Sequence, residues 1–138
     1  MGAIIVLADD EPDLRSIYAA CLRREGYDVW EASDGREALE LVESRRPCLL
    51  ILDVWMPVVN GLEVIEQLRH DPRSGRMRVV MLSNLGDSDT RLEGFSAGAS
   101  DYWVKGLSLA ELCQRVKRLL AEPQPAFDLA ESPSTLGD

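Results

Sequence analysis

The sequence predicts a doubly wound α/β fold, with a parallel sheet covered by helices on both faces. Strand-like apolar runs alternate five times with segments of helical periodicity. Three of the runs are continuously apolar, as expected of central parallel strands that are buried on both faces. Right-handed crossovers between successive strands place helices on the two sides of the sheet. With 138 residues, of which 46% are hydrophobic, the chain can form one domain with a sizeable core.

The first strand is predicted at about residues 3–8, and a helix follows at about 12–25. Pro12 suits the first turn of this helix, and Gly26 suits the position just past its end. Apolar residues recur at helical spacing and predict one buried face: Leu14, Ile17, Tyr18, Cys21 and Leu22.

The second βα unit begins with an alternating strand at 27–31. Asp34 is the predicted cap of the next helix, with Glu37 three residues later, and Pro47 stops that helix. The third strand is expected at 48–52, and a further helix begins near Gly61, with these side chains inward: Leu62, Ile65 and Leu68.

The last two units are predicted in the same way. A strand at 78–82 precedes a helix at about 87–97 that turns Leu92 and Phe95 inward. A strand at 101–104 precedes a helix capped by Ser108, with Glu111 three residues later. The residues expected to be buried by this last helix are Leu109, Leu112, Cys113, Val116 and Leu119 or Leu120.

Composition sets the expected boundaries and environment. Residues 1–121 are predicted to form the domain, and the Pro- and Ser-rich residues 122–138 a disordered tail or linker. The chain has 15 basic and 24 acidic residues, and its net charge of −9 offers no bulk attraction to nucleic acid or an anionic membrane. We expect a cytoplasmic protein, because the chain has neither a signal-peptide pattern nor an apolar run of roughly 20 residues. Cys21, Cys48 and Cys113 lack metal-ligand spacing and are expected to be small buried hydrophobes.

Reactive polar residues follow four of the predicted strands. Asp9 and Asp10 follow the first strand, Asp53 the third, Ser83 the fourth and Lys105 the fifth. Parallel α/β sheets bind ligands beyond the carboxyl ends of their strands, so these groups should meet at one edge. Crowded carboxylates repel unless a cation joins them, and Mg²⁺ takes one or two carboxylates together with phosphate oxygens. The set therefore predicts magnesium-assisted phosphoryl transfer to Asp53, with Lys105 and Ser83 binding the phosphoryl oxygens.

Four stretches resemble the receiver domain of bacterial two-component response regulators, of the kind found in chemotaxis regulators. They are IIVLADDE at 4–11, DVWMPVVNG at 53–61, VVMLS at 79–83 and GASDYWVK at 98–105. Their order and spacing fit along about residues 3–121. The resemblance implies a flavodoxin-like five-stranded sheet of order 2-1-3-4-5.

The resemblance also assigns roles. Asp53 matches the phospho-accepting aspartate, and Asp9 and Asp10 match the acidic pair that holds Mg²⁺ with the backbone carbonyl of Trp55. Lys105 matches the phosphate-binding lysine. Ser83 matches the switch hydroxyl and Tyr102 the switch aromatic, which is expected to turn inward when Ser83 moves toward a phosphoryl group.

The implied partners are a sensor histidine kinase or phosphotransfer protein and a downstream effector or output domain. A homodimer through the fourth helix, fifth strand and fifth helix is a further expectation, with no direct contact to nucleic acid or membrane. One departure from the family pattern is Gly106, where the family usually has proline, so the loop that carries Lys105 is expected to take a different path.

Three other interpretations stay open at this point. An aspartate-nucleophile phosphohydrolase usually has a second acid two residues after the nucleophile, where this chain has Trp55. A flavodoxin-type cofactor binder would need a hydroxyl- and glycine-rich loop in place of residues 9–11. A receiver-like interaction module that works without phosphorylation is disfavoured by the complete acidic set but permitted by Gly106.

Overall fold

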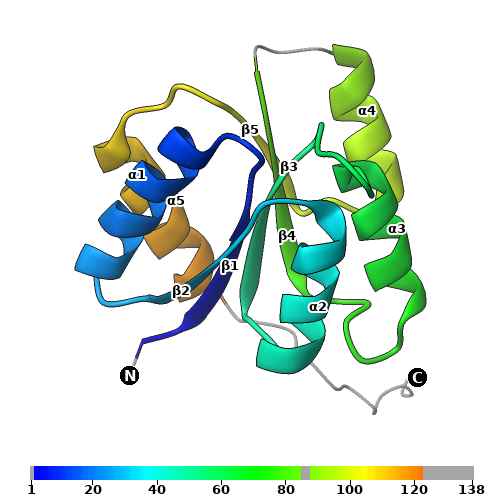
Figure 1. The fold of residues 1–138 in the computed structure, drawn as a ribbon, viewed down its shortest axis with the longest axis horizontal. Helices are drawn as coiled ribbons and strands as arrows, with labels where there is room; N and C mark the ends of the chain where they lie inside the picture. Colours follow the sequence, from blue (N-terminus) through cyan, green and yellow to red (C-terminus); the bar gives the residue numbers. More distant parts are fainter. Residues whose placement is uncertain (1, 85–87, 123–138) are drawn as a thin grey trace.

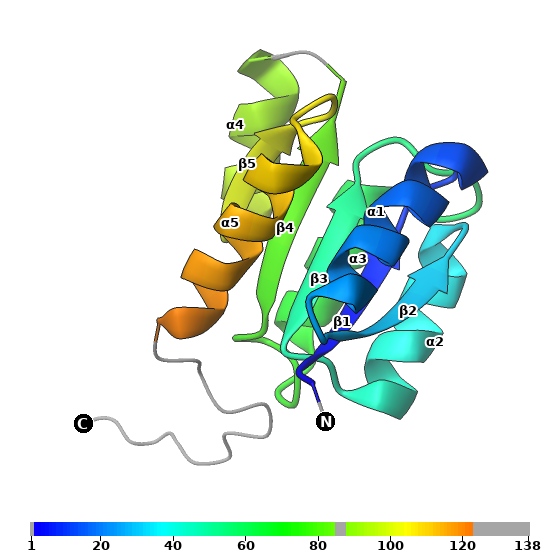
Figure 2. The same cartoon turned by 90° about the vertical axis from the view of Figure 1, so that its left-hand side faces the viewer.

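The computed structural model describes residues 2–84 and 88–122, and it has the predicted doubly wound architecture. Five parallel strands form one sheet of order β2-β1-β3-β4-β5. Helices α1 and α5 cover one face, and α2, α3 and α4 cover the other (Figures 1 and 2). The predicted fold class and strand order are confirmed. The predicted tail at 123–138 lies outside the described residues.

The element bounds agree with the sequence prediction to within a residue or two. The strands are β1 (Ile4–Ala8), β2 (Asp28–Ala32), β3 (Leu49–Asp53), β4 (Arg78–Ser83) and β5 (Asp101–Val104). The helices are α1 (Pro12–Arg24), α2 (Gly35–Arg45), α3 (Gly61–His70), α4 (Ser88–Ala97) and α5 (Leu109–Ala121).

The helix starts are fixed by the capping residues that the sequence indicates. The Asp34 side chain accepts a hydrogen bond from the Glu37 amide at 2.8 Å, and Ser108 accepts one from the Glu111 amide at 3.1 Å. Helix α3 has a full capping box, in which Asn60 and Glu63 each accept from the other's backbone amide. These bonds satisfy amides that would otherwise lack partners in the first turn.

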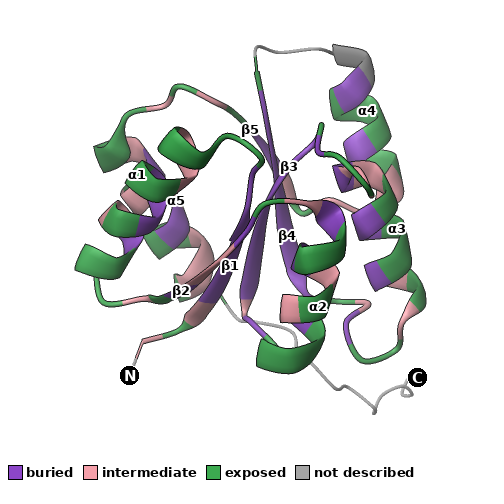
Figure 3. Cartoon of the chain, viewed as in Figure 1, coloured by how far each residue is buried: buried purple, intermediate pink, exposed green. Residues whose placement is uncertain are grey.

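The sheet is buried on both faces (Figure 3). Alternate residues of β3 point to opposite sides: Leu50 and Leu52 join the core under α2 and α3, whereas Leu49 and Ile51 join the core under α1 and α5. This double burial explains why β1, β3 and β4 are apolar without alternation. Among the described helices, none has the length and apolar character needed to cross a bilayer.

Several predicted core positions are wrong. Leu92 of α4 is 66% exposed and Phe95 is 41% exposed, because α4 instead turns the small residues Thr90 and Gly94 toward the sheet. Leu109 lies at the start of α5, beyond the cover of the sheet, and it is exposed. Ile17 of α1 is exposed as well.

The cysteines also differ from the prediction, since Cys21, Cys48 and Cys113 are half-buried rather than buried.

Candidate phospho-acceptor and metal site

The strand register brings the predicted site residues into one row at the carboxyl edge of the sheet. Ala8 pairs with Leu52, so Asp9 and Asp53 are the next residues on neighbouring strands. Asp53 in turn pairs with Leu82, which puts Ser83 one step further along β4. Ser83 pairs with Val104, and Lys105 follows directly. Four polar residues that are distant in sequence therefore lie at adjacent strand ends, as predicted.

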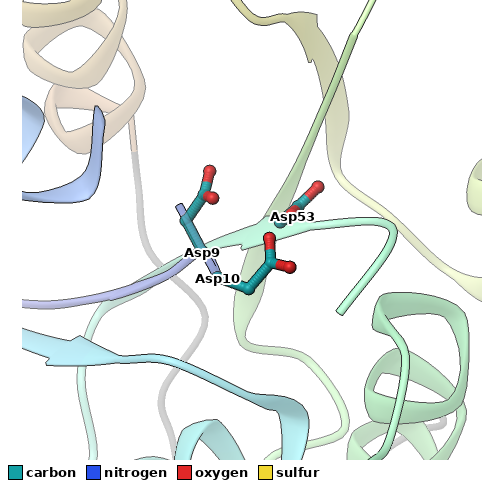
Figure 4. Close-up of side chains that lie close together, drawn as sticks. All are labelled: Asp9, Asp10 and Asp53. Carbon is teal, nitrogen blue, oxygen red and sulfur yellow. The ribbon is translucent and has the colours of Figure 1, made fainter. Parts of the chain in front are cut away.

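Three carboxylates gather at this edge. Asp9, Asp10 and Asp53 each offer an oxygen, and these oxygens all lie within 4.8 Å of one another. Figure 4 shows the three side chains at the ends of β1 and β3. Asp9 and Asp53 are buried, whereas Asp10 is exposed. The cluster thus has two carboxylates fixed in the protein and one that is open to solvent.

Local backbone amides hold the two buried aspartates in place. Asp9 Oδ1 accepts a hydrogen bond from the Glu11 amide at 2.8 Å, and Asp53 Oδ1 accepts one from the Trp55 amide at 3.3 Å. In each case the Oδ1 oxygen is used by the following loop, which leaves the Oδ2 oxygen directed to other groups. Trp55 itself is 59% exposed.

Lys105 supplies the positive charge of the site. Its Nζ lies 3.1 Å from Asp9 Oδ2 and 3.3 Å from Asp53 Oδ2, and its side chain is only 6% exposed. Burial by itself would lower the pKa of Lys105, but its close pairing with Asp9 and the charge of Asp53 raise that pKa above the ordinary value. The ammonium therefore stays protonated between the two buried carboxylates.

Gly106 explains how Lys105 reaches this position without the usual proline. Among the described residues no peptide bond is cis, and Gly106 has a φ of +96°. Such a φ is favourable for glycine and is not accessible to proline, whose ring fixes a negative φ. The Lys105 amide also donates to the Ser83 carbonyl at 2.6 Å. The different loop path that the sequence predicted thus still places the ammonium at the site.

The electrostatics of the cluster favour a bound cation. Burial, followed by the charge of Asp9, raises the pKa of Asp53 from 3.8 to about 7, although Lys105 acts in the opposite direction. Asp9 Oδ2 is buried and forms an ion pair with Lys105. Among the described residues, however, it accepts no hydrogen bond. A hard divalent cation would neutralise these oxygens. The residues present therefore fit Mg²⁺, which prefers carboxylate oxygens and retains waters on its open side.

Ser83 and Tyr102 form a hydroxyl pair beside the charged cluster. Ser83 Oγ and the Tyr102 hydroxyl lie 2.7 Å apart, and both residues are buried. The Ser83 hydroxyl donates to the Asn84 carbonyl at 3.1 Å, so Tyr102 is the donor to Ser83. The Tyr102 ring points inward beside α4, where it lies 6.4 Å from the Phe95 ring.

Glu11 belongs to the site, although no role was assigned to it from the sequence. Its Oε2 lies 3.4 Å from Lys105 Nζ. The signal in the sequence was its place directly after Asp9 and Asp10. Arg15 was not predicted at all; it donates to the Asp9 carbonyl at 2.7 Å and pairs with Glu31, which braces the loop after β1.

The fold and this edge together define a flavodoxin-like α/β domain with an acidic strand-end site. Residues 5–117 match the response regulator receiver domain family. The chain therefore belongs to the response regulator receiver family. It is a signalling receiver rather than a conventional enzyme, and receiver domains generally bind Mg²⁺ at an acidic cluster such as the one formed here by Asp9, Asp10 and Asp53.

Two relatives and one solved structure illustrate the match. The chain is 36% identical over 116 residues to the DNA-binding dual master transcriptional regulator RpaA of Synechocystis sp., covering 84% of this chain and 48% of that protein. It is 31% identical to the phosphate regulon transcriptional regulatory protein PhoB of Pseudomonas aeruginosa, covering 99% of this chain and 59% of that protein. A putative response regulator from Chloroflexus aurantiacus is 33% identical, with a TM-score of 0.83 over 88% of this chain and 100% of that one. The chain thus spans about half the length of the two transcriptional regulators.

Proposed function

We propose that the chain accepts a phosphoryl group on Asp53 and passes the signal to an effector. The observation that carries this proposal is the position of the Lys105 ammonium, 3.3 Å from Asp53 and 3.1 Å from Asp9, at the buried carboxyl edge of the sheet. A cation held there can bind an oxygen of a phosphoryl group attached to Asp53. The match of residues 5–117 to the receiver family supports the same assignment.

Asp9, Asp10 and Asp53 would hold Mg²⁺, together with the backbone carbonyl of Trp55. The closeness of the three carboxylates within 4.8 Å and the raised pKa of Asp53, caused first by burial and then by Asp9, support this ligand set. When bound, Mg²⁺ neutralises charge on the attacking and transferred oxygens and lowers the pKa of Asp53.

In the transfer step an oxygen of the Asp53 carboxylate forms a bond to phosphorus. The bond between phosphorus and the donor atom breaks, and its electron pair leaves with that atom. The donor atom is a histidine nitrogen in a kinase or phosphotransfer protein, or an oxygen in a small acyl phosphate. Lys105 and Ser83 bind the phosphoryl oxygens of the product, so that charge is balanced where it develops.

The hydroxyl pair offers a route by which this charge reaches the surface. Ser83 donates to the Asn84 carbonyl and accepts from Tyr102. The Ser83 proton can turn from that carbonyl to a phosphoryl oxygen while Ser83 still accepts from Tyr102. Phosphorylation would thus pull on Tyr102, whose ring lies 6.4 Å from that of Phe95 on α4. The surface of α4, β5 and α5 is then the element that changes.

The proposed partners are a sensor histidine kinase or phosphotransfer protein and a downstream effector or output domain, and the proposed location of the chain is the cytoplasm. Homodimerisation through α4, β5 and α5 is a further proposal. Charged residues on this surface can pair across such an interface: Arg91, Asp101, Arg115, Lys117 and Arg118. Two of them already have partners within the chain, since Arg115 binds Glu111 at 2.7 Å and Asp101 accepts from the Trp103 indole at 3.0 Å.

The test is to incubate the chain with Mg²⁺ and acetyl phosphate and to measure its intact mass, beside Asp53→Asn. We expect a magnesium-dependent gain of one phosphoryl group that is absent in the variant. A gain that persists in Asp53→Asn would move the acceptor elsewhere. The chain could also bind Mg²⁺ and yet gain no phosphoryl group, either from acetyl phosphate or from a panel of phosphorylated phosphotransfer proteins. That result would favour the interaction module that works without phosphorylation.

A further inference from the structure

Two cysteines from distant parts of the chain meet between α1 and α5. Cys21 Sγ lies 2.8 Å from Cys113 Sγ, although 92 positions separate them in the sequence. A disulfide bond is about 2.05 Å long, so bond formation needs the sulfurs to approach by less than about 1 Å. The packing of α1 against α5 therefore already supplies the juxtaposition that a disulfide requires.

Both sulfurs lie near the surface. Cys21 and Cys113 are half-buried, and they line a shallow groove between the helices together with Ile17, Arg24, Leu109 and Ala110. Ile17 and Leu109 are themselves exposed. A small oxidant can reach the pair from this groove.

Burial and contact with Cys21 affect the acidity of the Cys113 thiol. Burial, followed by the hydrogen bond with Cys21, raises the pKa of Cys113 to about 12. Cys113 therefore keeps its proton at neutral pH and is the weaker nucleophile of the pair, since the thiolate is the reactive form. We accordingly assign Cys113 as the resolving sulfur and its partner Cys21 as the attacking one.

We propose that Cys21 and Cys113 form a reversible disulfide when the protein meets a hydroperoxide. The Cys21 thiolate attacks one oxygen of hydrogen peroxide, the O–O bond breaks, and the departing hydroxide takes a proton to become water. The Cys113 sulfur then attacks the resulting sulfenic acid, the S–O bond breaks, and the Cys113 proton leaves with the hydroxide as a second water. Two thiols and one peroxide thus give one disulfide and two waters, with two electrons passing from sulfur to oxygen.

This bond would join the two helices that follow the charged loops. Helix α1 begins directly after Asp9, Asp10 and Glu11, and α5 begins shortly after Lys105. The two loops meet through the Lys105 pairs with Asp9 at 3.1 Å and Glu11 at 3.4 Å. The crosslink would also close a loop that contains most of the domain. Crosslinks that close long loops remove the most conformational entropy from the unfolded chain.

Cys48 provides a matched control within the same chain. It lies just before β3, and its thiol contacts the Ile4 carbonyl at 3.3 Å. Burial raises its pKa, so it is a poor nucleophile by comparison with a thiolate. A general sensitivity of the protein to oxidation would affect Cys48 together with the pair.

The experiment treats the full reduced chain with an equimolar amount of hydrogen peroxide, quenches with an alkylating agent and measures the mass and the peptide map. We expect the loss of two hydrogen atoms, a reducible link between the peptides that carry Cys21 and Cys113, and full alkylation of Cys48. Cys48→Ser should behave like the parent, whereas Cys21→Ser and Cys113→Ser should lose the link. The oxidised parent should also melt roughly 10 °C higher than the reduced form.

Three results would overturn the proposal: no change in mass, a link that involves Cys48, or linked dimers on a non-reducing gel in place of an internal bond. Circular dichroism of each serine variant shows whether it is folded, so loss of the link is not mistaken for unfolding. The readout requires neither Mg²⁺ nor a phosphodonor. Its failure is therefore distinct from failure of the phospho-acceptor proposal.

Discussion

Helices α3 and α4 cover the same face of the sheet but are anchored to it differently. Helix α3 buries Val64, Ile65 and Leu68 and begins with a full capping box. Helix α4 turns Thr90 and Gly94 toward the sheet and leaves Leu92 and Phe95 exposed. Burial of aliphatic side chains contributes most of the stability of a surface helix. Packing against the sheet therefore stabilises α4 much less than α3.

The difference matters because the two helices, which lie side by side, are connected to different residues of the candidate site. Helix α3 follows the loop that leaves Asp53, whereas α4 packs beside Tyr102, the partner of Ser83. A new charge on Asp53 would therefore act on two neighbouring helices, of which α3 is firmly anchored by apolar side chains and α4 is lightly held. Segments with few buried apolar contacts are the ones that rearrange at low cost.

The largest expected effect comes from truncating one apolar side chain in each helix. Ile65→Ala should lower the free energy of unfolding by about 3 kcal/mol, since it leaves a cavity in the core. Leu92→Ala on α4 should change it by less than about 0.5 kcal/mol, because the side chain is 66% exposed. Urea unfolding of both variants measures the contrast, and equal losses would contradict the description of α4 as lightly anchored.

Glycine-to-alanine changes sharpen the comparison. At Gly61 a Cβ atom would lie 2.4 Å from the Asp53 carbonyl oxygen, so Gly61→Ala must shift the backbone of the acceptor itself and should cost roughly 2–3 kcal/mol. At Gly94 the nearest atoms, Met81 Cγ and Tyr102 Cδ2, are 3.5 and 3.7 Å away. Gly94→Ala should therefore be tolerated and should gain about 0.5–1 kcal/mol from helix propensity.

The matched readout for this pair is phosphoryl uptake from acetyl phosphate, measured beside thermal unfolding. Gly61→Ala should slow uptake, because it moves Asp53. Gly94→Ala should leave uptake unchanged. If Gly61→Ala has the stability and the phosphoryl uptake of the parent, the loop after β3 deforms more easily than its contacts indicate.

The next effect tests how much the charged edge itself opposes folding. The pKa of Asp53 is raised to about 7, first by burial and then by Asp9. Because this pKa is higher in the folded than in the unfolded protein, protonated Asp53 favours folding. This contribution to the free energy of unfolding is fully present below the unfolded-state pKa of 3.8 and is lost as pH rises through about 7. Asp53→Asn does not titrate, so in EDTA at pH 8 it should be more stable than the parent by about 2 kcal/mol, an amount reduced by the lost pair with Lys105.

Urea unfolding between pH 4 and pH 8 provides the measurement. The advantage of Asp53→Asn should disappear toward pH 4. Added Mg²⁺ should stabilise the parent at pH 8 more than the variant. A parent that gains stability from pH 4 to pH 8 relative to the variant would show that the pKa of Asp53 is lowered in the folded protein.

The smallest effect concerns the hydroxyl pair on the α4 side. Tyr102→Phe removes the donor to Ser83 and should cost about 1 kcal/mol. It should leave phosphoryl uptake on Asp53 intact and should weaken the response of the α4 surface, followed by hydrogen exchange of α4 with and without phosphorylation. A response of α4 equal to that of the parent would exclude Tyr102 as the link.

The sequence by itself determined the fold class, the order of elements and most of the site. Continuous apolar strands require cover on both faces, and parallel strands must end at one edge, so Asp9, Asp53, Ser83 and Lys105 had to meet wherever the sheet formed. Capping residues set the helix starts, because unpaired amides of the first turn need nearby acceptors.

Only the tertiary structure decided the features that depend on how elements pack. Helical periodicity predicted the wrong face of α4 to be buried. The Tyr102 ring occupies the space between the sheet and α4, so Gly94 fits there better than a leucine. The inward place of Tyr102, the contribution of Glu11 and the meeting of Cys21 with Cys113 depend on distances between residues far apart in sequence. Local pattern fixes which side of an element is apolar, whereas the identity of the atoms that meet across two elements is set by their packing.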